Sequence, residues 1–446
     1  MTYTLLKMGA NVTLPKVYYY LFTFFVVALL MGYGSNSWIY PALVVALIIS
    51  LLLLIFKQKF WLISFFIASI AVLLYGFSFP RMANHGNLEF FIGLFIICFL
   101  LLKYKDIKNN TLSVKNITWF FRFSLLSIYF FAGFHKLNSG FFSINESCTF
   151  LINQGFFSTE ILTNTTIALV FQVGTILIEM LIPFGLLFRK TRKIAVLILL
   201  AFHIYLSFVG FSNFSSLAGF LLLGSLLSLK KIKQKHLIIY TVSAVIAVIT
   251  GFVLRNYTTL SFYKIAFING LIYNIGWVYF FYNLVKGIKF NTKNLQLSWQ
   301  LAIPVFFVFL WSSQAYIGLS NTGNLTMFSN LITESSRSNH FLINTKKTKL
   351  FFFEDDYVTI LELPDYCKWN GIEKLEGYDL PYIEFKTQVG FWKQKYNNPI
   401  PATVVYKKDT LQIDNLKNST FSTTNWWHKY LHFRKIPIKG NNECLW

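Results

Sequence analysis

The chain has 446 residues, of which 55% are hydrophobic and 13% are charged, and its mean hydropathy is +0.53. A soluble core cannot bury so much apolar surface, so the composition excludes a soluble protein and indicates a polytopic membrane protein. The net charge of +22 does not indicate nucleic-acid binding, because the Lys and Arg residues gather in short connections between apolar segments.

Apolar segments recur through the first three quarters of the chain. A helix needs roughly 17 to 20 apolar residues to cross about 30 Å of hydrocarbon, and we predict about eleven such spans, of which the shorter ones could be re-entrant or merged. They are residues 17–33, 39–56, 60–79, 88–102, 117–135, 165–188, 194–209, 214–229, 237–254, 264–282 and 299–317. The first span leads directly into the second, which predicts a retained anchor and no cleavable signal peptide.

Basic residues fall in every second connection between the predicted spans. They are Lys57, Lys59, Lys103, Lys105, Lys108, Lys115, Arg189, Lys190, Arg192, Lys193, Lys230, Lys231, Lys233, Lys235, Lys286, Lys289 and Lys293. Because positive loops stay in the cytoplasm, this pattern predicts a cytoplasmic N-terminus and an external, periplasmic C-terminal region.

The composition changes near residue 321, where charged residues, tyrosines and prolines become frequent. The alternating segments 357–363, 382–389 and 402–406 are typical of strands. We therefore predict an all-α polytopic membrane bundle in residues 1–320, followed by a small external β-rich or α+β domain in residues 321–446.

Three of the four cysteines lie on the predicted outer side. They are Cys148, Cys367 and Cys444, whereas Cys98 lies within a span. An external disulfide is permitted there, but three thiols do not determine a pairing, and unpaired cysteines are equally compatible with the sequence.

Ionisable groups within or at the ends of spans are costly in hydrocarbon, so each is a functional candidate. They are Arg81, His85, Glu89, His135, Lys136, Glu179 and His203. Neighbouring helices could bring His85 close to Lys136 on the outer side of the membrane. Simpler roles stay open: Lys136 could hold a helix end at the interface, His85 could be a solvated loop residue, and His203 could be a packing histidine. Glu179 could pair with a basic residue of a neighbouring helix or be protonated.

Other common chemistries leave no signature in the sequence. It has no phosphate-binding glycine loop, no His-Glu-x-x-His pair, no serine elbow and no Cys-x-x-Cys pair. A metal site built from the scattered histidines is weakly supported, because no two of those in the predicted membrane bundle have helix-turn spacing.

Four motifs resemble, in order, those of the vitamin K-dependent γ-carboxylases and their bacterial relatives, the HTTM-domain membrane proteins. The stretch Tyr129 to Asn138, YFFAGFHKLN, is similar to their Tyr-Phe-x-Ala-Gly-x-x-Lys-Leu-Asp. The others are Asn84-His85 before a hydrophobic helix, Ala201-Phe202-His203 after a basic turn, and Ser336-Arg337-Ser338-Asn339-His340 beyond the last span. The resemblance covers roughly residues 80 to 345.

The resemblance implies a reaction and roles for these residues. In the carboxylases a neutral lysine removes a proton from a reduced naphthoquinone, oxygen adds, and the resulting strong base deprotonates a glutamate that then takes up carbon dioxide. Lys136 would be this base, His85 would orient it or relay protons, and His203 would line the quinol pocket. Glu179 and His135 are further candidates for that pocket.

The same resemblance implies the partners and the location. The cofactor would be reduced menaquinone or a vitamin K-type naphthoquinol, an isoprenoid quinone drawn from the membrane lipid. The substrate would be a glutamate of a protein or peptide, and nucleic acid would not be a partner. The protein would lie in a bacterial inner membrane.

The sequence departs from the family pattern at three positions, where Asn138 replaces an aspartate, Phe141 replaces a tryptophan and His135 replaces the first of two lysines. The external region is also short compared with the one by which animal carboxylases hold their substrate. A non-catalytic transporter, channel or partner-binding scaffold is therefore the alternative, in which Glu179 and the histidines would serve proton or substrate passage.

Overall fold

The computed structural model describes residues 16–33, 41–56, 60–78, 84–102, 105–106, 109, 114–226, 233–287, 302–368, 374–438 and 444. The chain divides into two compact units. The first combines Met1–Ser78, His85–Phe130 and Leu177–Val308, and the second combines Phe79–Asn84, Phe131–Ile176 and Phe309–Trp446. Chain segments that are far apart in the sequence therefore meet in each unit.

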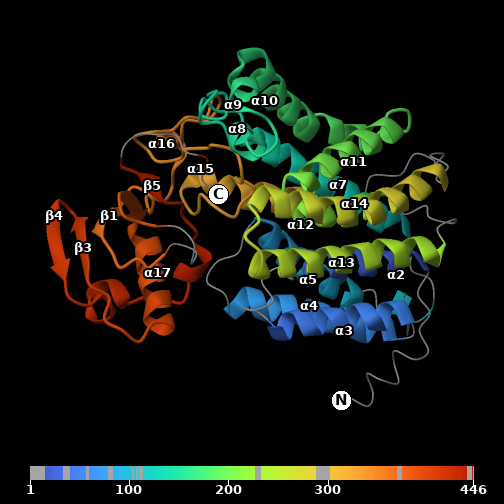
Figure 1. Cartoon of the computed structure of the whole chain (residues 1–446), viewed down its shortest axis with the longest axis horizontal. Coiled ribbons are helices and arrows are strands. Elements are labelled where there is room, and N and C mark those ends of the chain that lie inside the picture. Colours follow the sequence, from blue (N-terminus) through green and yellow to red (C-terminus); the bar gives the residue numbers. More distant parts are fainter. Residues whose placement is uncertain are drawn as a thin grey trace. The chain divides into compact units, whose positions relative to one another are not determined.

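Long helices build the first unit, and several of them lie nearly parallel or antiparallel to one another (Figure 1). Each of the eleven predicted spans coincides with a helix. The helices are α2 (Lys16–Tyr33), α3 (Pro41–Phe56), α4 (Trp61–Ser78), α5 (Asn84–Leu102), α7 (Val114–Phe134), α10 (Thr165–Met180) with the 3-10 turn η3 (Ile182–Leu186), α11 (Arg192–Phe208), α12 (Ser212–Ser225), α13 (Gln234–Tyr257), α14 (Phe262–Gly287) and α15 (Ala302–Ile317). Four of them, α5, α7, α10 and α15, also have residues in the second unit.

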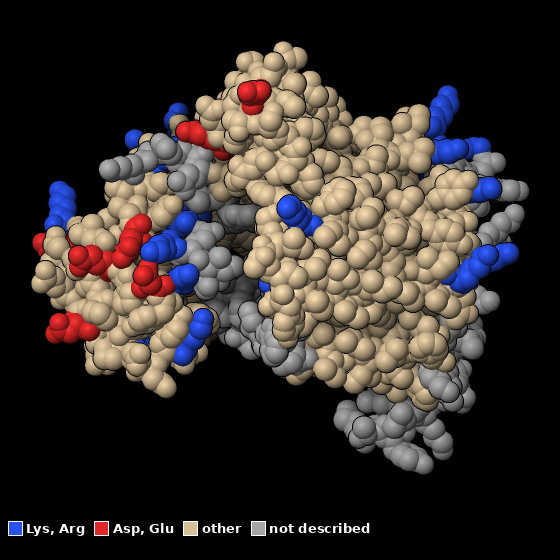
Figure 2. All heavy atoms as spheres, in the orientation of Figure 1, with Lys and Arg blue, Asp and Glu red and all other residues tan. Residues whose placement is uncertain are grey.

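Among the described residues, three helices are long and apolar enough to cross a membrane: Thr165–Leu186, Gln234–Tyr257 and Phe262–Lys286. Shorter apolar helices accompany them, at Tyr18–Tyr33, Ala42–Phe56, Gly86–Cys98, Thr118–Phe134 and Ile303–Ile317. In Figure 2 most of the visible surface of these helices carries no charged residue. The predicted helical bundle is confirmed, and its composition suits a membrane protein.

Helix α13 shows the pattern expected of a helix that faces lipid. Its exposed stripe consists of apolar residues at helical spacing, namely Ile239, Val242, Ile246, Ile249 and Val253. The opposite, buried face carries small residues, and Gly276 of α14 lies so close to it that an added Cβ would meet the Cα of Tyr240. Small residues at such a crossing let two helix backbones approach, as in membrane helix pairs.

The second unit contains a five-stranded antiparallel sheet in the order β4-β3-β1-β2-β5. The strands are β1 (Tyr357–Glu362), β2 (Tyr378–Pro381), β3 (Ala402–Tyr406), β4 (Asp409–Ile413) and β5 (Ile436–Pro437). The short helices of this unit are α8 (Cys148–Asn153), α9 (Thr159–Thr163), α16 (Thr345–Thr348) and the 3-10 turns η5 (Leu416–Asn418), η6 (Thr420–Ser422) and η7 (His428–Tyr430). The predicted strands 357–363 and 402–406 are thus confirmed to within a residue.

The predicted strand at 382–389 is wrong, because these residues begin helix α17 (Tyr382–Lys395). Ile383 and Phe385 alternate as in a strand, but the buried residues Phe385, Val389 and Trp392 follow at helical spacing. Together with residues of the strands, they form the hydrophobic core of this part of the unit.

A disulfide joins Cys148 to Cys444, with their Cα atoms 5.0 Å apart. It closes a loop of 296 residues within the second unit and so ties the region after the lysine motif to the end of the chain. Cys367 is a buried free thiol, and Cys98 is an exposed one. This resolves the pairing that the sequence left open.

Candidate functional site

The lysine motif lies where helix α7 ends, in the second unit. Lys136 is only 5% exposed, and its Nζ donates a hydrogen bond of 3.1 Å to the carbonyl oxygen of Ala132, one turn earlier. His135 is fully buried, and its Nδ1 shares a hydrogen bond of 2.7 Å with the hydroxyl of Tyr316, near the end of α15. The two predicted residues thus lie together in a site shielded from water.

Asn138 fixes the turn that follows. Its Nδ2 donates to the carbonyl oxygens of His135 (2.7 Å) and Ser329 (2.6 Å), and its Oδ1 accepts from the backbone N–H of Phe141 (2.8 Å) and from Nδ2 of Asn339 (3.2 Å). The side chain is completely buried. All four bonds require an amide, which both donates and accepts.

The segment after the last predicted span pairs with this turn. Asn138 and His340 form an antiparallel β-bridge, the backbone N–H of Phe341 donates to Leu137 O (2.9 Å), and that of Ser139 donates to Asn339 O (3.1 Å). The structure thus brings together two of the four motifs, which lie about two hundred residues apart in the sequence.

His340 is held in one tautomer by its bonds. Its Nε2 lies 3.1 Å from Phe134 O, while its Nδ1 accepts from the backbone N–H groups of Leu342 and Ile343, both at 3.1 Å. Nε2 therefore carries the proton and donates it. Burial lowers the pKa of His340, although the bond to Phe134 opposes this effect. We conclude that His340 is a neutral positioning residue for the end of α7.

Aromatic rings surround His135. The Tyr316 ring centroid lies 5.3 Å from that of His135 and 5.3 Å from that of His340, and the Phe134 ring lies 4.9 Å from His340. Phe131 adds a ring 6.2 Å from His135. Sequence reasoning did not single out Tyr316, whose position near the end of an apolar span was the only available signal.

The other predicted site residues lie in the first unit. His203 is fully buried in α11, where it shares hydrogen bonds with the Tyr129 hydroxyl and with Ser215 Oγ (3.4 Å). Glu179 is buried in α10. His85 is the second residue of α5, but its side chain lies outside the described residues, as does all of Arg81. The expected proximity of His85 to Lys136 thus stays a prediction.

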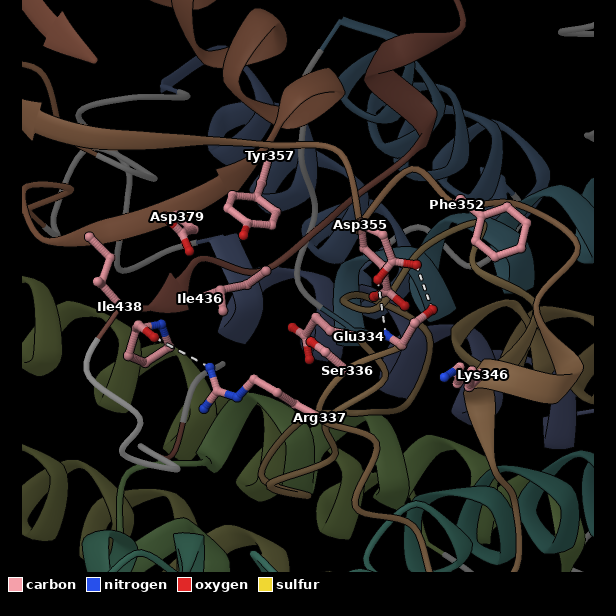
Figure 3. A pocket seen from close by; sticks show the side chains of 13 residues that line it. Glu334, Ser336, Arg337, Lys346, Phe352, Asp355, Tyr357, Asp379, Ile436 and Ile438 are labelled. Atoms are coloured by element: carbon pink, nitrogen blue, oxygen red, sulfur yellow. Dashed lines mark hydrogen bonds between the residues drawn. The ribbon is translucent and has the colours of Figure 1, made fainter. Parts of the chain in front are cut away.

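A pocket of about 600 Å³ opens elsewhere in the second unit (Figure 3). Its lining includes Glu334, Arg337, Glu354, Asp355 and Asp379, and does not include Lys136. The Arg337 side chain extends across the pocket and donates to Pro437 O at 3.3 Å.

Two carboxylates that line this pocket, Glu354 and Asp355, form ion pairs with the buried Lys349. The Lys349 ammonium lies 2.6 Å from Glu354 Oε1 and 2.8 Å from Asp355 Oδ2, while Glu354 Oε2 accepts from Asn321 Nδ2 and Thr333 Oγ1, both at 2.8 Å. Burial, and then the nearby charge of Glu334, raise the pKa of Glu354 to about 7.

A second ion pair joins Glu334 to Arg434. Both carboxylate oxygens of Glu334 accept from Arg434 Nη2 at 2.8 Å, and Oε1 also accepts from Nε at 3.1 Å. The carboxylates of Glu334, Glu354 and Asp355 thus face cations of the chain itself. Among the residues that the structure describes, no group of three His, Cys, Asp or Glu side chains is placed to hold a metal ion.

Comparison of the chain with protein-family models, with curated proteins and with solved structures finds no match. The resemblance to the carboxylases therefore rests on the four sequence motifs alone.

Proposed function

We propose that the chain is a membrane-embedded enzyme of the quinol-dependent carboxylase type, with Lys136 as the base. The observation that carries the proposal is the burial of Lys136 at a helix end beside His135 and Tyr316. A position shielded from water suits this chemistry, since water would quench a strong base.

The aromatic rings around His135, the residue before Lys136, support a naphthoquinol as the co-substrate, which would supply the reducing power of the reaction. Phe131 and Tyr316 contact the His135 ring and Phe134 contacts Tyr316, and such rings suit contact with a planar quinol. The Tyr316 hydroxyl and the His135 imidazole would orient the hydroxyl groups of the quinol, and Lys136 would accept the proton. A glutamate-type side chain would be the carboxylated group.

Placement in a bacterial inner membrane is part of the proposal. The outward apolar stripe of α13 supports contact with lipid. In the first unit, exposed basic residues gather where α11 and α13 begin and α14 ends, and these ends lie on one side (Figures 1 and 2). They are Arg189, Lys190, Lys193, Lys233, Lys235 and Lys286. This side is then cytoplasmic. The Cys148–Cys444 disulfide supports a periplasmic second unit, because disulfides persist in oxidising compartments.

One observation favours the second candidate, a non-catalytic membrane scaffold. The Lys136 amine donates to a carbonyl of its own helix, and both nitrogens of His340 are engaged in bonds to the backbone. A lysine that satisfies the last carbonyls of a helix is a common structural feature.

Chemical rescue separates the two roles. Protein in lipid nanodiscs is given reduced menaquinone, oxygen, carbon dioxide and a glutamate peptide, and quinone epoxide is measured. We expect Lys136→Ala to abolish epoxide formation and small primary amines to restore part of it, because a free amine can replace a base but cannot restore a helix end. Lys393→Ala, which removes an exposed lysine of α17, is the matched control and should retain activity. A Lys136→Ala variant as active as the parent would refute the proposal.

A further inference from the structure

The segment 340–352 of the second unit exposes a cluster of large apolar side chains, which we call the apolar patch. It consists of Phe341 (57% exposed), Leu342 (69%), Leu350 (71%), Phe351 (37%) and Phe352 (59%). Exposed apolar residues in such density mark an interaction surface.

The backbone around the patch is held firmly. Leu350 and Phe351 both donate backbone hydrogen bonds of 3.0 Å to Ile317 O, at the end of α15, and Thr348 Oγ1 donates to Tyr316 O at 2.9 Å. At the other end of the segment, Phe341 donates to Leu137 O. The apolar side chains therefore face outward because the fold places them there.

These bonds also fix the level of the patch along the helices. It lies at the ends of α7 and α15, and α15 exposes Phe309 and Leu310 within the same unit. Both α7 and α15 are among the shorter apolar helices of the described chain. In the proposed membrane placement their ends lie at the bilayer surface, so the patch lies at the depth where hydrocarbon meets headgroups.

Two cations complete the pattern. Lys346 and Lys347, both exposed, lie on the short helix α16 between the two halves of the patch. Apolar side chains flanked by lysines are typical of segments that lie in a membrane interface, where the ammonium groups meet anionic headgroups.

We infer that the apolar patch, with Lys346 and Lys347, is an interfacial anchor that docks on the anionic surface of the bilayer. This inference deepens the proposed function and rests on its membrane placement. The same segment carries His340, which bonds to Phe134 and pairs with Asn138. The anchor would therefore hold the turn that follows Lys136 close to the lipid from which a quinol arrives.

Lipid quenching of a fluorescent label tests this contact. Full-length protein carrying Cys98→Ser is given one new cysteine, at Leu342 or, as the matched control, at the exposed residue Gln412 of β4. The buried thiol of Cys367 and the disulfide stay unlabelled. The protein is reconstituted in phosphatidylglycerol vesicles with lipids brominated near the headgroup. We expect the label at position 342 to be quenched about threefold or more above the label at 412, because an interfacial side chain lies among the upper acyl carbons.

The opposing outcomes are distinct. Equal quenching at both positions overturns the inference. So does an unquenched label at position 342, if the unlabelled Leu342→Cys protein also forms a disulfide between two copies of the chain. Charge reversal at Lys346 and Lys347 should reduce quenching in anionic vesicles and not in zwitterionic ones. Epoxide formation is measured on the same samples. Quenching without epoxide formation would support the anchor and contradict the carboxylase proposal, whereas epoxide formation without quenching would support the carboxylase proposal and contradict the anchor.

Discussion

Replacing Glu354 by glutamine should remove a pH dependence from the stability of the sheet region. Glu354 is 1% exposed, and its pKa rises from an ordinary value of 4.5 to about 7, through burial and then the charge of Glu334. A carboxyl whose folded pKa lies above its unfolded pKa holds a proton in the folded state between the two values. The free energy of unfolding therefore falls as the pH rises from about 4.5 to about 7.

The magnitude follows from the size of the shift. One pKa unit corresponds to about 1.4 kcal/mol, so the parent should lose ~3 kcal/mol across this window. Asp355 does not mask the effect: hydrogen bonds and the charge of Lys349 outweigh its burial and lower its pKa from the ordinary 3.8, so the stability it contributes is lost only in more acid solution. The glutamine side chain of the variant has no proton to release, and its carbonyl oxygen can still accept from Asn321 and Thr333.

Hydrogen exchange of the β1 and β3 amides at pH 5, 6, 7 and 8, corrected for intrinsic rates, reports the local free energy of opening. We expect the free energy of opening to fall more steeply with pH, or to rise less, in the parent than in Glu354→Gln. Glu362→Gln is the matched control, since Glu362 is exposed on β1 and accepts from Thr403 Oγ1 at 2.7 Å. It should keep the parental slope. A slope in Glu354→Gln equal to that of the parent would refute the reasoning, because the other titrating groups of the unit, such as His340 and His428, contribute to both proteins alike.

Three further substitutions test other parts of the second unit. Arg434→Met leaves Glu334 buried without its cation and should lower the free energy of unfolding by about 3–5 kcal/mol in denaturant titrations. Its control, Lys374→Met, breaks an exposed pair and should leave that free energy unchanged within error. Gly318 has a φ of +81°, and an added Cβ would meet the carbonyl of Phe351, so Gly318→Ala should cost roughly 1–3 kcal/mol and speed hydrogen exchange in residues 348–351. Cys148→Ser should lower the midpoint of thermal unfolding, by an amount equivalent to ~2–5 kcal/mol, and change mobility on non-reducing gels.

The helices could be predicted from the sequence because an apolar run of span length has one stable form in lipid, as at α13 and α14. The segment 382–389 misled the prediction because the alternation of Ile383 and Phe385 fits a strand as well as it fits the start of a helix. The decisive residues, Val389 and Trp392, come at its end and beyond. The secondary structure of such a short segment is determined by its packing, here against the sheet.

The sequence could predict Lys136 and His135 as a pair of ionisable groups at a helix end, but not the partners that bury them. The Tyr316 hydroxyl reaches His135 from 181 residues away, and His340 reaches the Phe134 carbonyl from 206 residues away. Such contacts depend on how distant segments meet in one unit, and no local periodicity encodes them.

The departure at Asn138 from the aspartate of the carboxylase motif has a structural reason in this chain. An aspartate at this position could accept the bonds from Phe141 and Asn339 but could not donate to the carbonyl oxygens of His135 and Ser329, which its carboxylate would repel. Two buried carbonyls would lose their donor, at about 1–3 kcal/mol each. The contacts with residues 329–341 therefore require an asparagine at position 138. If position 138 were an aspartate, a different partner would have to face it, so an Asn138→Asp substitution is expected to need a compensating change within residues 329–341.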